Sequence, residues 1–221
     1  MENGSLRGIR QRDGSYALFL RVPGGVLGPE DLEHIGRVAR EHDVPLVKVT
    51  SGQRLALIGV SEEDIPAIRA DIGCGEGAAA GPGLCFVQAC PGSLACPHGV
   101  QDALSLALAL EEIHRERAFP AKVKIGVSGC PRCCAGSYVR DVGVVGTGSG
   151  WTVTFGGNAG GRPRIGDVVA EGLDRSAAVE TVACLLDRYE EGARPGERTA
   201  RFAERCGCGR TAEQDTNRQE R

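Results

Sequence analysis

Two short cysteine clusters constrain this chain more than any other feature. The first runs Cys90-Pro-Gly-Ser-Leu-Ala-Cys96, with five residues between its thiols, and the second runs Cys130-Pro-Arg-Cys133-Cys134. Prolines follow Cys90, Cys96 and Cys130, and a proline fixes φ and cannot continue a regular helix or a strand ladder. We therefore expect both clusters to lie in loops beside regular structure, where thiols from distant parts of the chain can converge.

Four converging thiolates suit a cubane iron–sulfur cluster and equally a tetrahedral zinc ion. Structural zinc sites usually place their paired ligands two to four residues apart, so the five-residue gap and the adjacent Cys133 and Cys134 fit zinc poorly. A disulfide is disfavoured in a reducing compartment. The spacing thus favours iron–sulfur over zinc. Cys184 lies in an apolar pattern and is expected to be a small buried residue instead.

The overall composition is that of an ordinary globular protein. The 221 residues are 41% hydrophobic and 25% charged, with 10 cysteines. A net charge of -3 argues against a nucleic-acid partner, because nucleic-acid-binding surfaces need a basic excess. No apolar run reaches membrane length, and the first residues lack the pattern of a signal peptide. We expect a cytoplasmic protein with no nucleic-acid or membrane partner.

Hydrophobic patterns divide the chain into an α+β arrangement of two domains. In residues 1–73, strands near 16–22, 46–49 and 55–60 alternate with a helix from Pro29 and a second helix that Ser61 caps. This order predicts a small ferredoxin-like α/β sandwich. A Gly/Ala-rich linker follows, and then a second α+β domain over 74–206. The polar residues 207–221 are predicted to be a disordered tail.

The second domain is expected to hold both cysteine clusters. Strands are predicted at 84–87, 122–127, 142–145 and 151–155, with helices at 97–117 and 176–191. This places Cys96 at the N-terminus of the long helix, whose dipole would favour its thiolate form. Glycines beside the thiols, such as Gly92 and Gly129, would let backbone amides approach the sulfur atoms.

The cysteine spacing, C-x5-C followed by C-x3-C, resembles the signature of the sirohaem-dependent sulfite and nitrite reductases. The segments 89–99 and 122–136 carry the match, and 47–60 is similar to the ferredoxin-like half-domain of that family. The length points to the small, single-copy members. The resemblance implies that Cys90, Cys96, Cys130 and Cys134 hold a [4Fe-4S] cluster, and that Cys134 also bridges to the iron of a sirohaem. Cys133 is extra to the pattern and is expected to be a spectator.

The same resemblance assigns anion-binding roles to basic residues. Sirohaem carries eight carboxylates, so its pocket needs cations. Arg54, in the turn with Thr50 and Gln53, matches a macrocycle- and anion-binding arginine of the family. Lys122 and Lys124 alternate along a strand and match lysines that contact sulfite or nitrite. The alternative to an anion-binding role is that both lysines are solvated side chains on a strand edge.

One departure from the family pattern concerns an arginine. Members often have one a few residues before the first cluster cysteine, whereas residues 83–89 here contain no basic residue. Arg132 or Arg140 could take its place; otherwise substrate reduction would be weak. A half-length chain could also complete its site across a homodimer, and a fully active monomeric holoprotein would contradict that hypothesis.

The expected function is six-electron reduction of sulfite to sulfide or nitrite to ammonia. The chain carries no dinucleotide fingerprint, because Gly146-Thr-Gly148 lacks the third glycine and a following helix. Electrons would therefore come from an external donor, such as ferredoxin or a reductase subunit. The alternatives are a non-catalytic iron–sulfur or sirohaem electron-transfer subunit of a larger complex, and a zinc-stabilised interaction domain.

Overall fold

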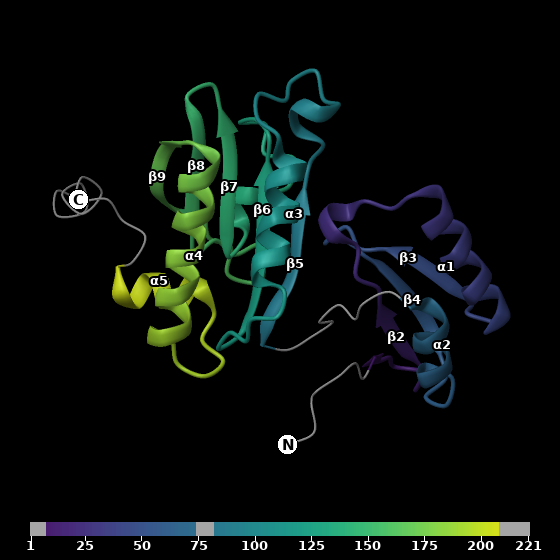
Figure 1. The fold of residues 1–221 in the computed structure, drawn as a ribbon. Coiled ribbons are helices and arrows are strands. Elements are labelled where there is room, and N and C mark those ends of the chain that lie inside the picture. Colours follow the sequence, from purple (N-terminus) through teal and green to yellow (C-terminus); the bar gives the residue numbers. More distant parts are fainter. Residues whose placement is uncertain (1–7, 74–81, 208–221) are drawn as a thin grey trace. The chain divides into compact units, whose positions relative to one another are not determined.

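The computed structural model describes residues 8–73 and 82–207 (Figure 1). The chain divides into two compact units, Met1–Gly81 and Pro82–Arg221, and each is considered by itself. The predicted linker and the predicted disordered tail lie largely outside the described residues. Within the described residues, no helix is long and apolar enough to cross a membrane.

The first unit is an antiparallel sheet covered by two helices. Its strands pair in the order β1-β2-β4-β3. The helices supply the buried apolar side chains Ile35, Val38, Ile65, Ile68 and Ile72, which pack against Leu18 and Leu57 of the sheet. The elements are β1 (Ile9–Arg10), β2 (Tyr16–Phe19), η1 (Pro23–Gly25), α1 (Pro29–Glu41), β3 (Leu46–Val49), β4 (Leu55–Val60) and α2 (Ile65–Ile72). This is the ferredoxin-like order that the sequence predicts.

The start of α2 differs from the prediction. The Ser61 hydroxyl accepts from the Asp64 amide at 3.1 Å and donates to the Asp64 carboxylate at 2.7 Å, so it closes a turn over residues 61–64, and Asp64 is the N-cap of the helix. The helix begins only at Ile65, with Pro66 in its first turn. A serine followed by acidic residues suits a turn as well as a cap, so the sequence alone did not separate the two.

The second unit is a five-stranded mixed sheet in the order β5-β6-β7-β8-β9. The first three strands are parallel, and β8 and β9 join them antiparallel. Helices α3 and α4 pack on one face, where Figure 1 shows them side by side. The elements are β5 (Gly83–Ala89), η2 (Gly92–Leu94), α3 (Ala103–His114), β6 (Lys122–Ser128), η3 (Ser137–Val139), β7 (Val142–Thr147), β8 (Gly150–Phe155), β9 (Asp167–Leu173), α4 (Arg175–Gly192) and α5 (Thr199–Cys206).

The two faces of this sheet differ in character because side chains alternate along a strand. On β6, Val123, Ile125 and Val127 are fully buried in the core that includes α3 and α4. Lys122 and Lys124 therefore point to the opposite face. We call this second side of β5 and β6 the open face, since α3 and α4 do not cover it. Burial of the apolar face holds the strands together, and the open face carries the lysines of β6.

Two predictions about the second unit are wrong. The long helix begins at Ala103 with Asp102 as its N-cap, so Cys96 lies in a turn and gains nothing from a helix dipole. Cys184 is exposed on α4, because Val182, Leu185 and Leu186 form the buried face and residue 184 points away from it. Strand β9 and helix α5 were not predicted.

A buried histidine makes the stability of the second unit pH-dependent. His114 is fully buried, and within the described residues its Nε2 has no hydrogen-bond partner. Burial lowers the pKa of His114 to about 4, and the nearby charge of Arg117 adds to the effect while Asp187 opposes it. The unfolded chain therefore binds a proton more readily than the folded one between pH 6.5 and 4.

We expect the free energy of unfolding to fall as the pH drops through this window and to be level above it. The measurement is urea unfolding at several pH values, followed by the fluorescence of Trp151, the single tryptophan of the chain. A His114→Leu variant should show a smaller decrease between pH 6.5 and 4.5. An equal decrease in both proteins would contradict the assignment.

Candidate metal centre

The two cysteine clusters lie side by side because they follow neighbouring parallel strands. Cys90 comes directly after β5 and Cys130 comes two residues after β6. These strands are in register, with Ala89 opposite Val127, so their carboxyl ends meet at one edge of the sheet. The backbone amide of Gly129 donates a hydrogen bond to Cys90 Sγ at 3.1 Å. The fold thus brings segments 39 residues apart into direct contact.

Backbone hydrogen bonds join the remainder of the two loops. The amides of Val100 and Gln101 both donate to the carbonyl of Gly129, at 2.9 and 3.0 Å. Cys96 N–H in turn donates to the carbonyl of Gly92 at 2.9 Å. In the predicted helix the Gln101 amide would donate to the carbonyl of Pro97, but here it donates to Gly129, so residues 97–101 stay outside the helix. The loop that carries Cys96 is therefore fixed to the loop that carries Cys130.

Glycines allow this close approach. A Cβ atom placed on Gly129 would lie 2.5 Å from Gly92 Cα, and one placed on Gly99 would lie 2.2 Å from the Gly92 carbonyl carbon. Gly92 itself has a φ of 58°, in the region that glycine adopts readily. Any larger residue at these positions would push the loops apart. The glycines thus allow the two thiol-bearing loops to pack against each other.

The four predicted ligands differ in exposure. Cys130 is buried, Cys90 and Cys96 are half-buried, and Cys134 is exposed. Within the described residues, no group of three or more Cys, His, Asp or Glu side chains is already gathered around one point. The donors nevertheless fit an iron–sulfur cluster, because the thiols come from loops bonded to each other and a backbone N–H already points at sulfur. The two adjacent cysteines also differ in backbone conformation. Cys133 has a left-handed φ of 56°, whereas the φ of Cys134 is not positive.

The connection from β6 to β7 carries the second cluster across the open face. Parallel strands need a connection that returns along the sheet, and here residues 129–141 provide it with the short η3 and no α-helix. The hydroxyls of Ser128 and Ser137 lie 2.8 Å apart, and Ser128 also accepts from the Ala135 amide. A Cβ on Gly126 would lie 3.1 Å from the Ala135 carbonyl oxygen. The cysteine loop therefore packs directly on β6.

Basic residues gather on the open face beside this loop. Lys124 is half-buried with its Nζ 5.7 Å from the centre of the Phe86 ring, and the Arg140 guanidinium lies 5.7 Å from the same ring. Arg140 also donates to the side chain of Gln88 at 2.6 Å. Lys122, one pleat away, is exposed. The predicted lysine pair thus shares one face, and Arg140 joins it.

Arg140 reaches this position by crossing a glycine. Its Cγ lies 2.8 Å from the place that a Cβ of Gly126 would occupy. Gly126 pairs with Gln88 on β5, which is the residue that the guanidinium contacts. The positive charge of Arg140 therefore lies in space beside Gln88, two residues before Cys90. The sequence around Gln88 itself has no basic residue. Arg132, the other candidate, is exposed.

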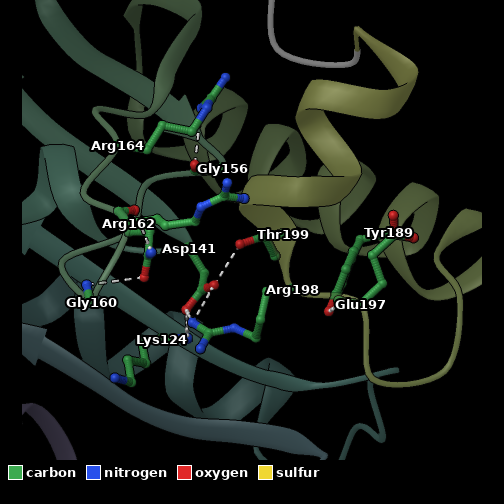
Figure 2. Close-up of polar contacts among 11 residues, drawn as sticks. Lys124, Asp141, Gly156, Gly160, Arg162, Arg164, Tyr189, Glu197, Arg198 and Thr199 are labelled. Atoms are coloured by element: carbon green, nitrogen blue, oxygen red, sulfur yellow. Dashed lines mark hydrogen bonds and ion pairs between the residues drawn. The ribbon is translucent and has the colours of Figure 1, made fainter.

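Asp141 organises this region and was not singled out from the sequence. Its carboxylate is 1% exposed, and it accepts from the guanidinium of Arg198 at 2.8 Å and from the Thr199 hydroxyl (Figure 2). It also accepts from the backbone amide of Lys124 at 3.0 Å. Figure 2 shows the Lys124 side chain pointing away from this carboxylate. Asp141 thus ties α5 to β6, and among the described residues the Lys124 ammonium forms no ion pair.

Three further predicted residues lie together in the first unit. Thr50, Gln53 and Arg54 form the turn between β3 and β4, where the Thr50 hydroxyl accepts from the Arg54 amide at 3.2 Å. Arg54 is buried at 7% exposure, with its guanidinium 5.0 Å from the Phe19 ring centre. The structure brings these three side chains to one turn, on a different unit from the cysteines.

Two family models match the chain. Residues 80–220 match the nitrite and sulphite reductase 4Fe-4S domain, and residues 9–73 match the nitrite/sulfite reductase ferredoxin-like half domain. An assimilatory-type sulfite reductase of Nitratidesulfovibrio vulgaris is 44% identical over 200 residues, which cover 90% of this chain and 92% of that protein. A nitrite reductase [NAD(P)H] of Bacillus subtilis is 41% identical, covering 89% of this chain but only 24% of its own length.

Solved structures share the fold. Dissimilatory sulfite reductase I superimposes with a TM-score of 0.75 at 15% identity, covering 87% of this chain and 67% of that chain. The Mycobacterium tuberculosis NirA protein gives a TM-score of 0.74 at 17% identity, covering 88% and 38%. The α+β fold class predicted from the sequence is thereby confirmed. Family models match both domains, and a relative of similar length is 44% identical. The chain therefore belongs to the nitrite and sulphite reductase family.

Proposed function

We propose that this protein reduces sulfite to sulfide, or nitrite to ammonia, with electrons from an external donor. The observation that carries the proposal is the pair of thiol-bearing loops, bonded to each other at the carboxyl ends of β5 and β6. The Nitratidesulfovibrio relative, which is similar over nearly its whole length, favours sulfite as the substrate.

The proposed cofactors are a [4Fe-4S] cluster and a sirohaem. Cys90, Cys96, Cys130 and Cys134 would hold the cluster, and the exposed Cys134 would also ligate the sirohaem iron. When bound, these groups would supply electron transfer and a metal that binds the anion. Thr50, Gln53 and Arg54 would contact the macrocycle from the first unit.

The role of the protein side chains is to hold and protonate the anion. Lys122 and Lys124 would attract it electrostatically and donate protons to its oxygens. Burial lowers the pKa of Lys124, and the nearby charge of Lys122 lowers it further, against the charges of Cys85 and Asp141. A lysine with a lowered pKa gives up its proton more easily, which suits a reaction that consumes protons.

The electron donor would be ferredoxin or a separate reductase subunit, in the cytoplasm, where thiols stay reduced. A second copy of this chain remains a proposed partner, with Lys122 and Lys124 facing the macrocycle of the partner. The alternative function is that of an electron carrier, and a Bacillus subtilis assimilatory nitrate reductase electron transfer subunit, 28% identical over 195 residues, favours it.

The test is a visible spectrum followed by paired assays. Protein purified without oxygen should show absorption from both an iron–sulfur cluster and a sirohaem, and it should release sulfide from sulfite with reduced viologen as donor. The same assay with nitrite ranks the two substrates. Protein freed of sirohaem but retaining iron is the matched control, and it should be inactive.

Two results would favour the competing functions instead. A cluster without any macrocycle, and no sulfide or ammonia formed, would support the electron carrier. A colourless protein with bound zinc would support an interaction domain. Either of these outcomes contradicts the proposed enzyme.

A further inference from the structure

We infer that Arg140 is an additional oxyanion-binding residue of this site and acts together with Lys124. The inference rests on the proposed function and adds a residue to it. Both side chains lie on the open face against the same Phe86 ring. The pairing of β5 with β6 explains this arrangement, because Phe86 is opposite Lys124 and Gln88 is opposite Gly126, over which the Arg140 stem packs.

The position of Arg140 is fixed by the fold. Its stem packs over Gly126, and its guanidinium lies 3.5 Å from the place where a Gly136 Cβ would stand. Its hydrogen bond to Gln88, 2.6 Å long, anchors one nitrogen beside the residues that lead into Cys90. Gly136 belongs to the cysteine loop, so the arginine touches both segments that carry the thiols. A charge held in this way requires little reorganisation when an anion binds.

In the part of the chain that the structure describes, no carboxylate is paired with Lys124 or Arg140. Within the described residues, neither side chain forms an ion pair, and Nε of Arg140 is buried without a hydrogen-bond partner. The neighbouring carboxylate of Asp141 is already used by Arg198, Thr199 and the Lys124 amide. Burial lowers the pKa of Arg140, although the charges of Asp141 and Cys133 oppose the effect. A bound anion would offset the cost of keeping these two cations partly out of water.

A second arginine in the same unit provides the comparison. Arg117 also lies over a phenylalanine, 5.1 Å from the Phe119 ring centre. It donates to Asp187 at 2.8 Å and to Glu190, and these hydrogen bonds raise its pKa despite partial burial. Arg117 is therefore a structural cation with its charge satisfied. Arg140 has the same aromatic support, but among the described residues its side chain bonds only to the neutral amide of Gln88, which leaves its charge available for a ligand.

The ligand is an oxyanion, because a guanidinium fork matches the oxygens of a carboxylate or of a small oxyacid. Two sources share this chemistry: the substrate anion and a carboxylate of the macrocycle. If the substrate is the source, removing Arg140 weakens its binding while the macrocycle stays in place. If a macrocycle carboxylate is the source, the same change lowers the amount of macrocycle bound per chain.

The experiment uses the holoprotein with Arg140→Gln, Arg140→Lys and the control Arg117→Gln. Sulfite is titrated while the haem absorption is followed, and iron and macrocycle per chain are measured separately. We expect Arg140→Gln to keep its iron, and either to raise the sulfite Kd by roughly 10- to 100-fold or to lose most of its macrocycle. Arg140→Lys should show a sulfite Kd or a macrocycle content between those of the parent and Arg140→Gln, since lysine keeps the charge but not the planar pair of N–H donors. Arg117→Gln should match the parent in both measurements.

The results distinguish this inference from the proposed function. Iron retained by Arg140→Gln shows that the variant is folded around its cluster. If that variant also keeps the parental sulfite Kd and macrocycle content, Arg140 is not an anion ligand, while the reductase assignment stands. If Arg117→Gln shows the same loss as Arg140→Gln, the effect is a general one of removing an arginine, and the inference fails. A parent protein without macrocycle or sulfite binding would overturn both.

Discussion

Replacing Cys130 with serine is expected to remove most of the iron from protein purified without oxygen. Cys130 is the most buried of the four proposed ligands, at 6% exposure, and its loop is bonded to the loop of Cys90 through Gly129. Serine oxygen is a harder donor than thiolate and a poor substitute in a cubane cluster. The loss is measured as iron and sulfide per chain and as the disappearance of the cluster absorption.

Cys184→Ser is the matched control for this change. Cys184 is an exposed thiol on α4, on the far side of that helix from the core, so its loss should leave the iron content unchanged. Substitution of Cys130 tests the ligand set more directly than substitution of Cys134, because the thiol of the adjacent Cys133 could replace the thiol of Cys134 as a ligand. Iron retained at the parental level in Cys130→Ser would contradict the proposed ligand set.

Replacing Asp141 with asparagine is expected to destabilise the second unit by about 3 kcal/mol, the lower end of the range for breaking a buried ion pair. The carboxylate is buried, whereas its partner Arg198 is 30% exposed, which moderates the cost. Asparagine would leave that guanidinium without its counter-ion and would disturb the bonds to Thr199 and to the Lys124 amide. Urea unfolding followed by Trp151 fluorescence measures the change.

Asp187→Asn provides the comparison for Asp141. Its carboxylate is exposed on α4, and its partner Arg117 keeps a second carboxylate, Glu190. We expect its free energy of unfolding to stay within about 0.5 kcal/mol of the parent. Because Asp141 also holds the strand that carries Lys124, Asp141→Asn should weaken substrate binding as well. Equal stability of the two variants would refute the central role of Asp141.

The sequence predicted those parts of the site that depend on local patterns. Prolines after the thiols indicated loops, apolar alternation indicated β5 and β6, and the meeting of the two loops follows from parallel strands sharing an edge. The alternation of Lys122 and Lys124 likewise placed both on one face. Gly129 was expected to bring a backbone amide close to sulfur, and its N–H donates to Cys90 Sγ.

The errors arose where distant contacts override local preference. Residues 97–101 have a helical pattern, but the carbonyl of Gly129 takes the amides of Val100 and Gln101 and holds them in a turn. The true signal was Asp102, whose carboxylate caps the helix at the Ser105 amide. The partners of Asp141 and Arg140 are far along the chain, at 198 and 88, so no local pattern could reveal them.

The crossing of Arg140 over Gly126 has a consequence for the history of the family. A side chain at position 126 would occupy the space of the arginine stem, whose Cγ lies 2.8 Å from the Cβ position. Substitutions at positions 126 and 140 are therefore coupled. In a set of related sequences, a long basic residue at 140 should therefore occur with glycine at 126, whereas glycine at 126 should persist without that residue, because the backbone of Ala135 and Ser137 also crowds the position.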